Sequence, residues 1–194
     1  MNSILISQPS RCSWCGDDPL YQAYHDQEWG VPSRDDHHLF EMLILEGAQA
    51  GLSWYTVLKK RERYREVFDG FNAEKIIAYG PEKIASLLAD PGIIRNRLKV
   101  AGTVKNARAY LQLREQHGSF SSWLWKFVGD RPLQNNFSAR DELPAKTAIS
   151  DLMCKELRRA GFTFVGSTIC YAFMQAVGMV NDHTTECFRH SELL

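Results

Sequence analysis

Side chains of the metal-binding types stand near both ends of this 194-residue chain, and they restrict its fold more than any other feature. Cys12, Cys15 and His25 come early, whereas His183 and Cys187 come close to the other end. The last two are four residues apart, one helical turn, so both can face one ion. Two ligands from each end would complete a tetrahedral zinc site without an open position, which is the structural type. Such a site requires the two ends to meet.

The spacing leaves two ligand sets open. His183 and Cys187 can combine with Cys12 and His25, or Cys15 can replace His25 and form a Cys-x-x-Cys pair. The total of five cysteines is odd, which argues against a disulfide framework. Two further cysteines lie within apolar helical patterns and are interpreted as inert core residues, namely Cys154 and Cys170.

The rest of the chain shows the apolar spacing of helices. After Asp35–Asp36, which offers a cap, large apolar residues at positions 39, 40, 43 and 44 share one helical face. The same signals predict helices over residues 54–68, 72–78, 93–114, 120–127, 147–160 and 167–178, and a further helix from 81. Residues 131–146 are expected to form a long loop. Because no segment shows the sustained alternation of strands, we predict an all-α fold in one compact unit, residues 1–194.

The segment 150–178 is predicted to be a helix, a short glycine-bounded hairpin and a second helix. Gly161 ends the first helix, and the second begins at Gly166, Ser167 and Thr168. A helix start exposes free N–H groups at its positive end, and a glycine there lets a phosphate approach the backbone closely. The pattern is typical of a DNA backbone contact that reads no sequence. Taken alone, it favours a plain corner between two helices over a DNA contact.

Charge and hydropathy indicate where the protein is located and how it can contact nucleic acid. Lys plus Arg equals Asp plus Glu, 23 each, so contact with nucleic acid must rest on local basic patches such as residues 59–65 and 95–99. Residues 1–7 lack the pattern of a signal peptide, and no later segment has 18 consecutive apolar residues. We therefore expect a soluble cytoplasmic protein, a monomer without membrane contact.

Eight short motifs spread over nearly the whole chain carry a family resemblance. They are RCSW at 11–14, DPLY at 18–21, YHDQEWGVP at 24–32, FEMLILEG at 40–47, QAGLSW at 49–54, GIIR at 92–95, FVGSTICY at 164–171 and VNDH at 180–183. With these motifs the chain resembles the 3-methyladenine DNA glycosylase I family, a branch of the helix-hairpin-helix DNA glycosylases. The resemblance implies an enzyme that hydrolyses the N-glycosyl bond of 3-methyladenine in double-stranded DNA.

The resemblance also implies roles for particular residues. Zinc is expected on Cys12, His25, His183 and Cys187, which leaves Cys15 beside the site. The expected base pocket has Tyr24 and Glu46 as its polar groups and tryptophans as its walls, with Trp54 as the stacking platform beside Trp14 and Trp29. Leu52, which follows Gly51, matches the residue that fills the gap left by an everted base, and Gly166, Ser167 and Thr168 match the DNA anchor.

The implied pocket agrees with the chemistry of the expected substrate. A glycosylase must take its target base out of the duplex, and an adenine alkylated at N3 is cationic. A buried carboxylate and electron-rich indole faces favour such a base. Glu46, which lies among apolar residues, is therefore the predicted catalytic and base-binding carboxylate.

Other glycosylases of this superfamily carry an aspartate shortly after the second hairpin helix. Here Asn181 stands in its place, so we do not assign that role to the neighbouring Asp182. The weak glycosidic bond of an alkylated base tolerates this absence. Ser167 and Thr168 stand where bifunctional relatives carry a lysine, which predicts a monofunctional enzyme. The alternative is a zinc-stabilised, non-enzymatic binder of damaged DNA, whereas a zinc deaminase is disfavoured because its motifs are absent.

Overall fold

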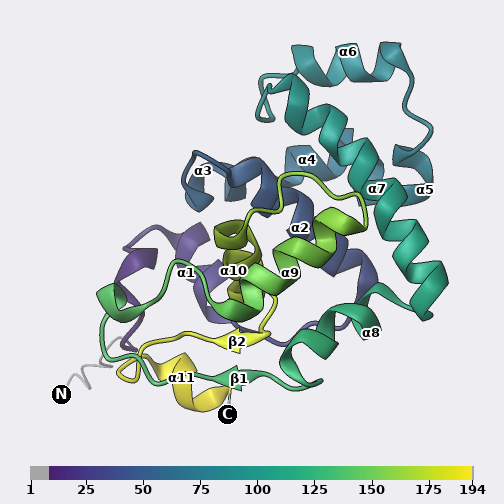
Figure 1. Ribbon diagram of the computed structural model, residues 1–194. Coiled ribbons are helices and arrows are strands. Elements are labelled where there is room, and N and C mark those ends of the chain that lie inside the picture. Colours follow the sequence, from purple (N-terminus) through teal and green to yellow (C-terminus); the bar gives the residue numbers. More distant parts are fainter. Residues whose placement is uncertain (1–8, 194) are drawn as a thin grey trace.

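One helix, α2 (Asp36–Gln49), lies at the centre of the structure and is enclosed on nearly all sides. Asp35 caps it by accepting a hydrogen bond from the backbone N–H of His38 (2.7 Å). Every residue from Leu39 to Ala48 is buried, which is the pattern of a helix that forms the core itself. Figure 1 shows the other helices arranged around α2. Any functional group on α2 is therefore held in the protein interior.

This computed structural model describes residues 9–193. Residues 1–7, where we expect no signal peptide, lie outside that range. The other α-helices are, in chain order, α1 (Pro19–Gln27), α3 (Trp54–Leu58), α4 (Arg61–Val67), α5 (Ala73–Ile76), α6 (Pro81–Ala89), α7 (Arg97–His117), α8 (Phe120–Trp125), α9 (Ala148–Arg159), α10 (Ser167–Ala176) and α11 (Phe188–Glu192). The prediction of a mostly helical fold is confirmed. None of the described helices has the length and apolar character needed to cross a membrane.

The prediction of a single helix over residues 54–68 is wrong. The chain forms two helices, α3 and α4, with a break at Lys59 and Lys60. Arg61, at the start of α4, is directed into the protein and reaches Glu41 of α2 (2.6 Å) and Glu28 (2.5 Å). The break places Arg61 in this buried ion pair. The spacing of apolar residues does not report such a break, so the sequence could not predict it.

The basic patch predicted at residues 59–65 is largely neutralised within the protein. Arg63 binds Asp90 (2.7 Å), and Arg65 binds Glu41 (2.8 Å). With Arg61 also paired, three of its five cations face carboxylates. Its contribution to a positive surface is correspondingly small.

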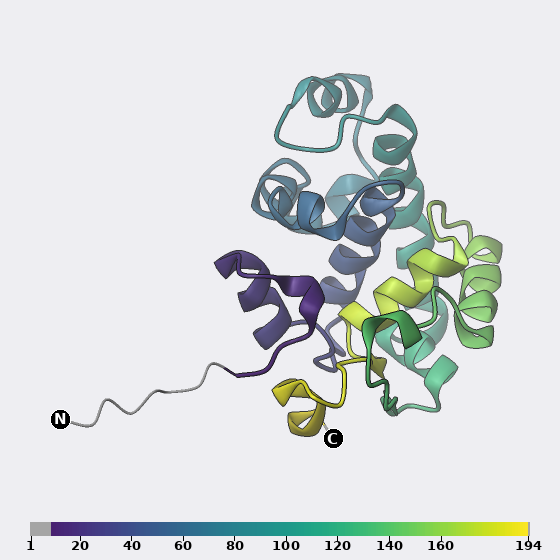
Figure 2. The same ribbon diagram turned by 90° about the vertical axis from the view of Figure 1, so that its left-hand side faces the viewer.

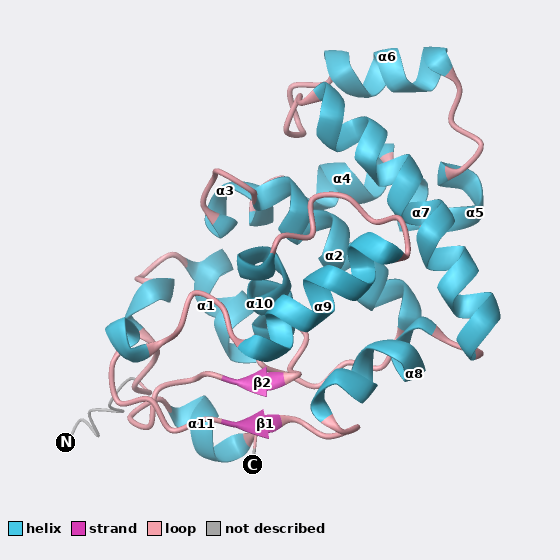
Figure 3. Cartoon of the chain, viewed as in Figure 1, coloured by secondary structure: helices cyan, strands magenta, loops and turns pink. Residues whose placement is uncertain are grey.

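The expected loop at 131–146 contains one strand of the only β-sheet in the part of the chain that the structure describes. Strand β1 (Leu133–Gln134) pairs in parallel with β2 (Val180–Asn181), as Figure 3 shows. The side chain of Asn181 donates to Gln134 Oε1 (2.9 Å) and to the backbone carbonyl of His190 (3.0 Å). Strands of two residues are too short to show alternation, so the sequence could not predict them.

The two ends of the chain lie side by side. The backbone N–H of Phe188, the first residue of α11, donates to the carbonyl of Ser10 (3.0 Å). Figures 1 and 2 show the described N-terminal segment next to α11 from two directions. The prediction that the two ends of the chain meet is confirmed.

The connection at 161–166 joins α9 and α10, which pack against each other. Asn106 of α7 holds it, because its side chain accepts from the N–H of Thr163 (2.8 Å) and donates to the Thr163 carbonyl (3.0 Å). Phe164 has a positive φ of 59° and lies so close to Gly47 and Gly102 that neither position has free space for a Cβ. The hairpin is thus seated on α2 and α7.

Gly178, which follows α10, provides a test of this packing. An added Cβ would lie 2.3 Å from the carbonyl carbon of Val31 and 2.4 Å from the nitrogen of Pro32, and φ is +70°. We expect Gly178→Ala to lower the free energy of unfolding by about 3 kcal/mol or more, because backbone atoms cannot yield as side chains do.

The matched control is Gly118→Ala, where φ is +81° but no atom lies within 4 Å of the added Cβ. It carries only the left-handed strain and should cost about 1 kcal/mol. Both values come from urea unfolding, and equal losses in the two variants would contradict the clash.

Candidate functional site

A cavity of about 330 Å³ lies beside the C-terminal half of α2. Its walls come from α1, α2, α3 and α10, from the segments on either side of α1 that carry Trp14 and Trp29, and from the loop that contains the 3-10 turn η4 (Arg140–Glu142). All five residues that the sequence predicted for a base pocket line it: Trp14, Tyr24, Trp29, Glu46 and Trp54. The structure therefore brings together side chains from segments that are separate in the chain.

Five aromatic side chains line the cavity, two tyrosines and three tryptophans. The rings of Tyr24 and Trp54 have centroids 5.2 Å apart and are tilted by 42°. Trp14 lies edge-on to Trp29, with centroids 4.9 Å apart, and contacts Tyr21 at 5.0 Å. Such walls present ring faces and edges to a flat aromatic ligand.

Glu46 is the exceptional group of the cavity. The residue is 2% exposed, and burial raises the pKa of its carboxyl to about 8. Its Oε2 has no hydrogen-bond partner among the residues that the structure describes. A buried carboxyl without a donor costs free energy that the folded protein must recover elsewhere. A buried, unpaired carboxyl of this kind is typical of a ligand-binding site.

Glu41, on the same helix, shows the opposite situation. Burial acts to raise the pKa of its carboxyl, but Arg61 and Arg65 outweigh that effect and leave the pKa below its usual value. Its Oε1 accepts from Arg61 Nε at 2.6 Å and from Arg65 Nε at 3.0 Å. The fold therefore supplies cations to one buried carboxylate of α2 and none to the other.

Two more polar atoms in the cavity lack partners. Gln49 Oε1 and Trp54 Nε1 are buried and unbonded, so three of the four such side-chain atoms in residues 9–193 line this one cavity. Two of the three groups offer acceptors, and the indole N–H is a donor. The cavity suits a flat ligand with N–H groups and at least one acceptor.

A second cluster lies where the chain ends meet. The ligand atoms of Cys12, His25, His183 and Cys187 all lie within 4.8 Å of one another, and all four residues are buried. Cys187 Sγ is 3.4 Å from His25 Nε2 and 3.4 Å from His183 Nδ1. Ligands on a tetrahedral zinc ion would be about 3.6 Å apart for one sulfur and one nitrogen. The cluster can hold a metal ion.

The groups behind the cluster fix its imidazoles. His25 Nδ1 lies 2.7 Å from Asp26 Oδ1, and Arg11 in turn binds Asp26 (2.8 Å). His183 Nε2 lies 3.0 Å from the carbonyl of Trp29. In both rings the second nitrogen is thereby turned toward the cluster, as in metal-binding histidines. Hydrogen bonds from Cys12 and then from the two histidines lower the pKa of the Cys187 thiol, which favours the thiolate that metals bind.

Cys15 is not part of the cluster. Its Sγ donates to the carbonyl of Cys12 at 3.2 Å instead. The described residues therefore gather only one of the two ligand sets that the spacing left open, the set with His25. Cys154 and Cys170 are buried, as expected of core thiols.

The residues predicted to contact DNA lie in the turn between α2 and α3 and at the start of α10. Gly51 has a φ of +80°, and Leu52 is 44% exposed in the turn between α2 and α3. Gly166 is the N-cap of α10, and Ser167 Oγ lies 2.9 Å from Ser150 Oγ. Thr168 is exposed at the same helix start.

Sequence reasoning missed several residues of the cavity. Tyr21 and Gln49 lie three residues from Tyr24 and Glu46 on the same helices, so helical spacing could have indicated them. The remaining ones come from α10 and from the loop around η4, and only tertiary structure brings them here: Arg140, Leu143, Pro144, Ala172 and Gln175.

Asp182, to which we assigned no catalytic role, is fully engaged in the interior. Its oxygens accept from Asn135 Nδ2 (2.6 Å), Tyr171 OH (2.7 Å) and Gln175 Nε2 (2.8 Å). Through Gln175 it supports the cavity wall. These contacts account for its burial.

Fold and site together define a helical protein with a cavity lined by aromatic rings and unpaired polar groups. Residues 14–190 match the family model described as methyladenine glycosylase, and the chain belongs to this family. It is 51% identical over 177 residues to DNA-3-methyladenine glycosylase 1 of Escherichia coli (strain K12), covering 91% of this chain and 95% of that protein.

Solved structures agree. A crystal structure of 3-methyladenine DNA glycosylase I has a TM-score of 0.90 and 52% identity, covering 92% of this chain and 98% of that one. A substituted form of 3-methyladenine DNA glycosylase I in complex with 3-methyladenine has a TM-score of 0.89 and 34% identity, covering 92% and 96%.

The raised pKa of Glu46 predicts how the free energy of unfolding depends on pH. Between about pH 4.5 and pH 8 the unfolded chain has lost this proton while the folded protein retains it. Stability must then fall as pH rises through that window, by about 1.4 kcal/mol per pH unit from this group. Because Glu46→Gln cannot ionise, its free energy of unfolding should fall less steeply than that of the wild type.

The measurement is urea unfolding at several pH values across the window. Glu115→Gln, a change at an exposed glutamate of α7, is the control and should follow the wild type. Parallel curves for wild type and Glu46→Gln would contradict the buried, protonated carboxyl.

Proposed function

We propose that this chain is a DNA repair glycosylase that hydrolyses the N-glycosyl bond of 3-methyladenine in alkylated DNA. Membership of the methyladenine glycosylase family supports the reaction, and so does the likeness to a structure that contains 3-methyladenine. The observation that carries the proposal for this chain is Glu46, a buried carboxyl without a partner in an aromatic cavity.

The site residues act by selecting and holding the everted base. Trp54 stacks on it, Trp14 and Trp29 close the cavity, and Tyr24 and Glu46 form its polar side. A cationic base next to Glu46 lowers the pKa of that carboxyl, so the group becomes ionised when the base enters. The carboxylate then balances the charge that burial of the base would otherwise leave uncompensated.

Bond breaking needs little acid catalysis, because an alkylated adenine is a cationic leaving group. The bond between the sugar and the base breaks, the electron pair goes to the base, and the sugar becomes oxocarbenium-like. Water adds to the sugar carbon and loses a proton to the solvent, which completes hydrolysis. Ser167 and Thr168 offer no amine for a Schiff base, so we propose a monofunctional enzyme without lyase activity.

Double-stranded DNA is the proposed partner, with two loops as the contacts. The helix-hairpin-helix segment 150–178 would hold a phosphate at the N-terminus of α10 through Gly166, Ser167 and Thr168. Leu52, presented by Gly51, would fill the gap left by the base. We propose that the whole chain works as one unit and as a monomer.

Cys12, His25, His183 and Cys187 would hold one Zn²⁺. Four ligands leave no open position, so the ion would stabilise the joined chain ends and take no part in hydrolysis. The buried donors, their mutual distances and the partners behind both histidines support this assignment.

Base release tests the proposed activity. Methylated duplex DNA is incubated with the protein, and the released bases are identified by chromatography. We expect 3-methyladenine, and a rate at least about 100-fold lower for Glu46→Ala. Glu115→Ala, at an exposed position, is the control. Binding of methylated DNA without release of any base would instead support the non-enzymatic alternative.

Metal content tests the zinc site. Cys187→Ser should reduce bound zinc from about one ion per chain to nearly none and lower the melting temperature by about 10 °C or more. Cys15→Ser is the matched control, since Cys15 is equally buried and lies beside Cys12 without joining the cluster. An unchanged melting temperature in Cys187→Ser, or loss of zinc in Cys15→Ser, would refute the assigned ligand set.

A further inference from the structure

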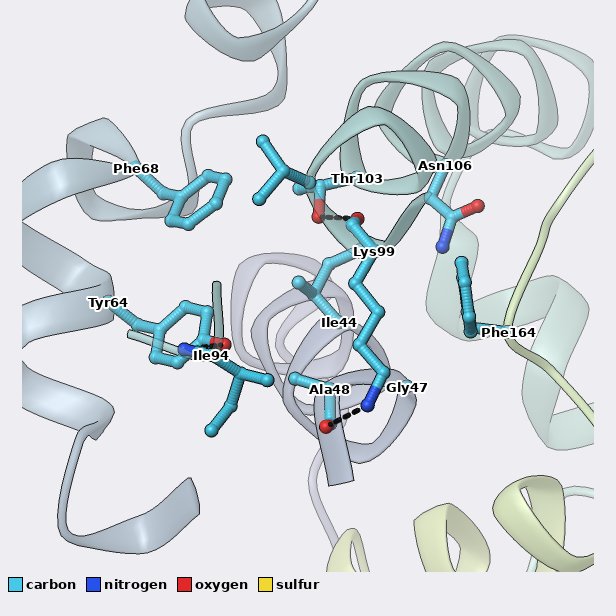
Figure 4. A pocket seen from close by; sticks show the side chains of 11 residues that line it. Ile44, Gly47, Ala48, Tyr64, Phe68, Ile94, Lys99, Thr103, Asn106 and Phe164 are labelled. Carbon is cyan, nitrogen blue, oxygen red and sulfur yellow. Dashed lines mark hydrogen bonds between the residues drawn. The ribbon is translucent and has the colours of Figure 1, made fainter. Parts of the chain in front are cut away.

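The C-terminal end of α2 is tied to α7 by a single lysine. The last carbonyls of a helix have no partner within the helix. Lys99 supplies one, because its Nζ donates to the carbonyls of Ala48 (2.8 Å) and Ala50 (2.7 Å). Figure 4 shows the side chain of Lys99 extended toward Ala48. A cation at this end of a helix also interacts favourably with the helix dipole.

Lys99 is turned into the protein and is not part of a solvated basic face. It lines a small cavity of about 20 Å³ with Ile44, Tyr64 and Phe68, and burial lowers the pKa of its ammonium group. No carboxylate of residues 9–193 forms a salt bridge with it. Its hydrogen bonds go to these two backbone carbonyls.

The two carbonyls bracket the residues that lead to the DNA-facing turn. Between them lies Gln49, whose side-chain Oε1 is one of the unbonded atoms of the cavity. Directly after them come Gly51, where an added Cβ would meet no atom within 4 Å, and the exposed Leu52. Apart from Lys99, this turn is held by two backbone hydrogen bonds, from Leu52 N–H to the Gln49 carbonyl (2.6 Å) and from Ala50 N–H to the Gly47 carbonyl (3.3 Å).

We infer that Lys99 is a positioning residue for base eversion, which holds the backbone of residues 48–50 so that Leu52 stands ready to enter the duplex. This inference rests on the proposed function. A side chain that fills a gap in DNA must keep its place against the bases that would close the gap. Without the tether, the turn would lose conformational entropy at the moment of insertion, and the everted state would be less populated.

The first test compares reaction on duplex DNA with binding of the free base. Lys99→Met removes the donors and the charge while keeping the aliphatic length. We expect kcat/KM for release of 3-methyladenine from methylated duplex to fall at least about tenfold. The Kd of free 3-methyladenine, followed by tryptophan fluorescence, should change less than about threefold, because Glu46 and Trp54 keep their places.

Two variants serve as comparisons. Lys99→Arg keeps the charge and the donors and should recover part of the lost activity. Lys105→Met removes a charge from an exposed lysine of the same helix and should behave as the wild type. A loss in Lys99→Met that affects both readouts equally would indicate general damage to the pocket and would overturn the inference.

A double-mutant cycle identifies the residue through which Lys99 acts. If Lys99 serves Leu52, then Leu52→Ala already removes the benefit, and the double variant should be no slower than Leu52→Ala alone. The deficit of Lys99→Met should also shrink on single-stranded methylated DNA, which has no gap to fill. Losses that multiply, or an equal deficit on single strands, would overturn the inference. Wild-type protein that releases no base would refute the proposed function itself, whatever the variants do.

Discussion

Two carboxylates buried on one helix govern the organisation of this protein. Burial of a charge is costly unless a partner accompanies it, and α2 carries both Glu41 and Glu46 into the interior. Glu41 receives Arg61 and Arg65, whose placement requires the chain to break between α3 and α4. Glu46 receives no cation from the residues that the structure describes. Because the fold supplies cations to Glu41 and none to Glu46, the second position agrees with the ligand-binding role that we propose for Glu46.

The Cys/His cluster and the cavity lie on two sides of one wall. Tyr24 and His25 are neighbours on α1, where successive side chains point in different directions, so one lines the cavity while the other joins the cluster. Trp29 connects the two again, since its ring lines the cavity and its carbonyl contacts His183. Closing the chain ends on an ion would therefore also hold the aromatic wall against which a base must stack.

The sequence predicted the parts of this protein that rest on local patterns or on a strong family resemblance. The helix from Asp36, the meeting of the ends and the gathering of Tyr24, Glu46 and Trp54 at one cavity are of this kind. The break after α3, the pairing of β1 with β2 and the approach of Arg140 to the cavity were missed. Each depends on a partner distant in the chain, which periodicity within a segment does not report.

The long helix α7 sets the separation between the two loops that would meet DNA. Lys99 and Asn106 are seven residues apart, two helical turns, and so lie on nearly the same face. Lys99 holds the turn that follows α2, and Asn106 holds the 161–166 hairpin through Thr163. Between these two contacts Phe164 packs against Gly47 and Gly102, where space remains for no larger residue. A loop that fills a gap and a helix start that binds a phosphate must stand at a fixed distance on one duplex, and a rigid helix beneath both satisfies that requirement.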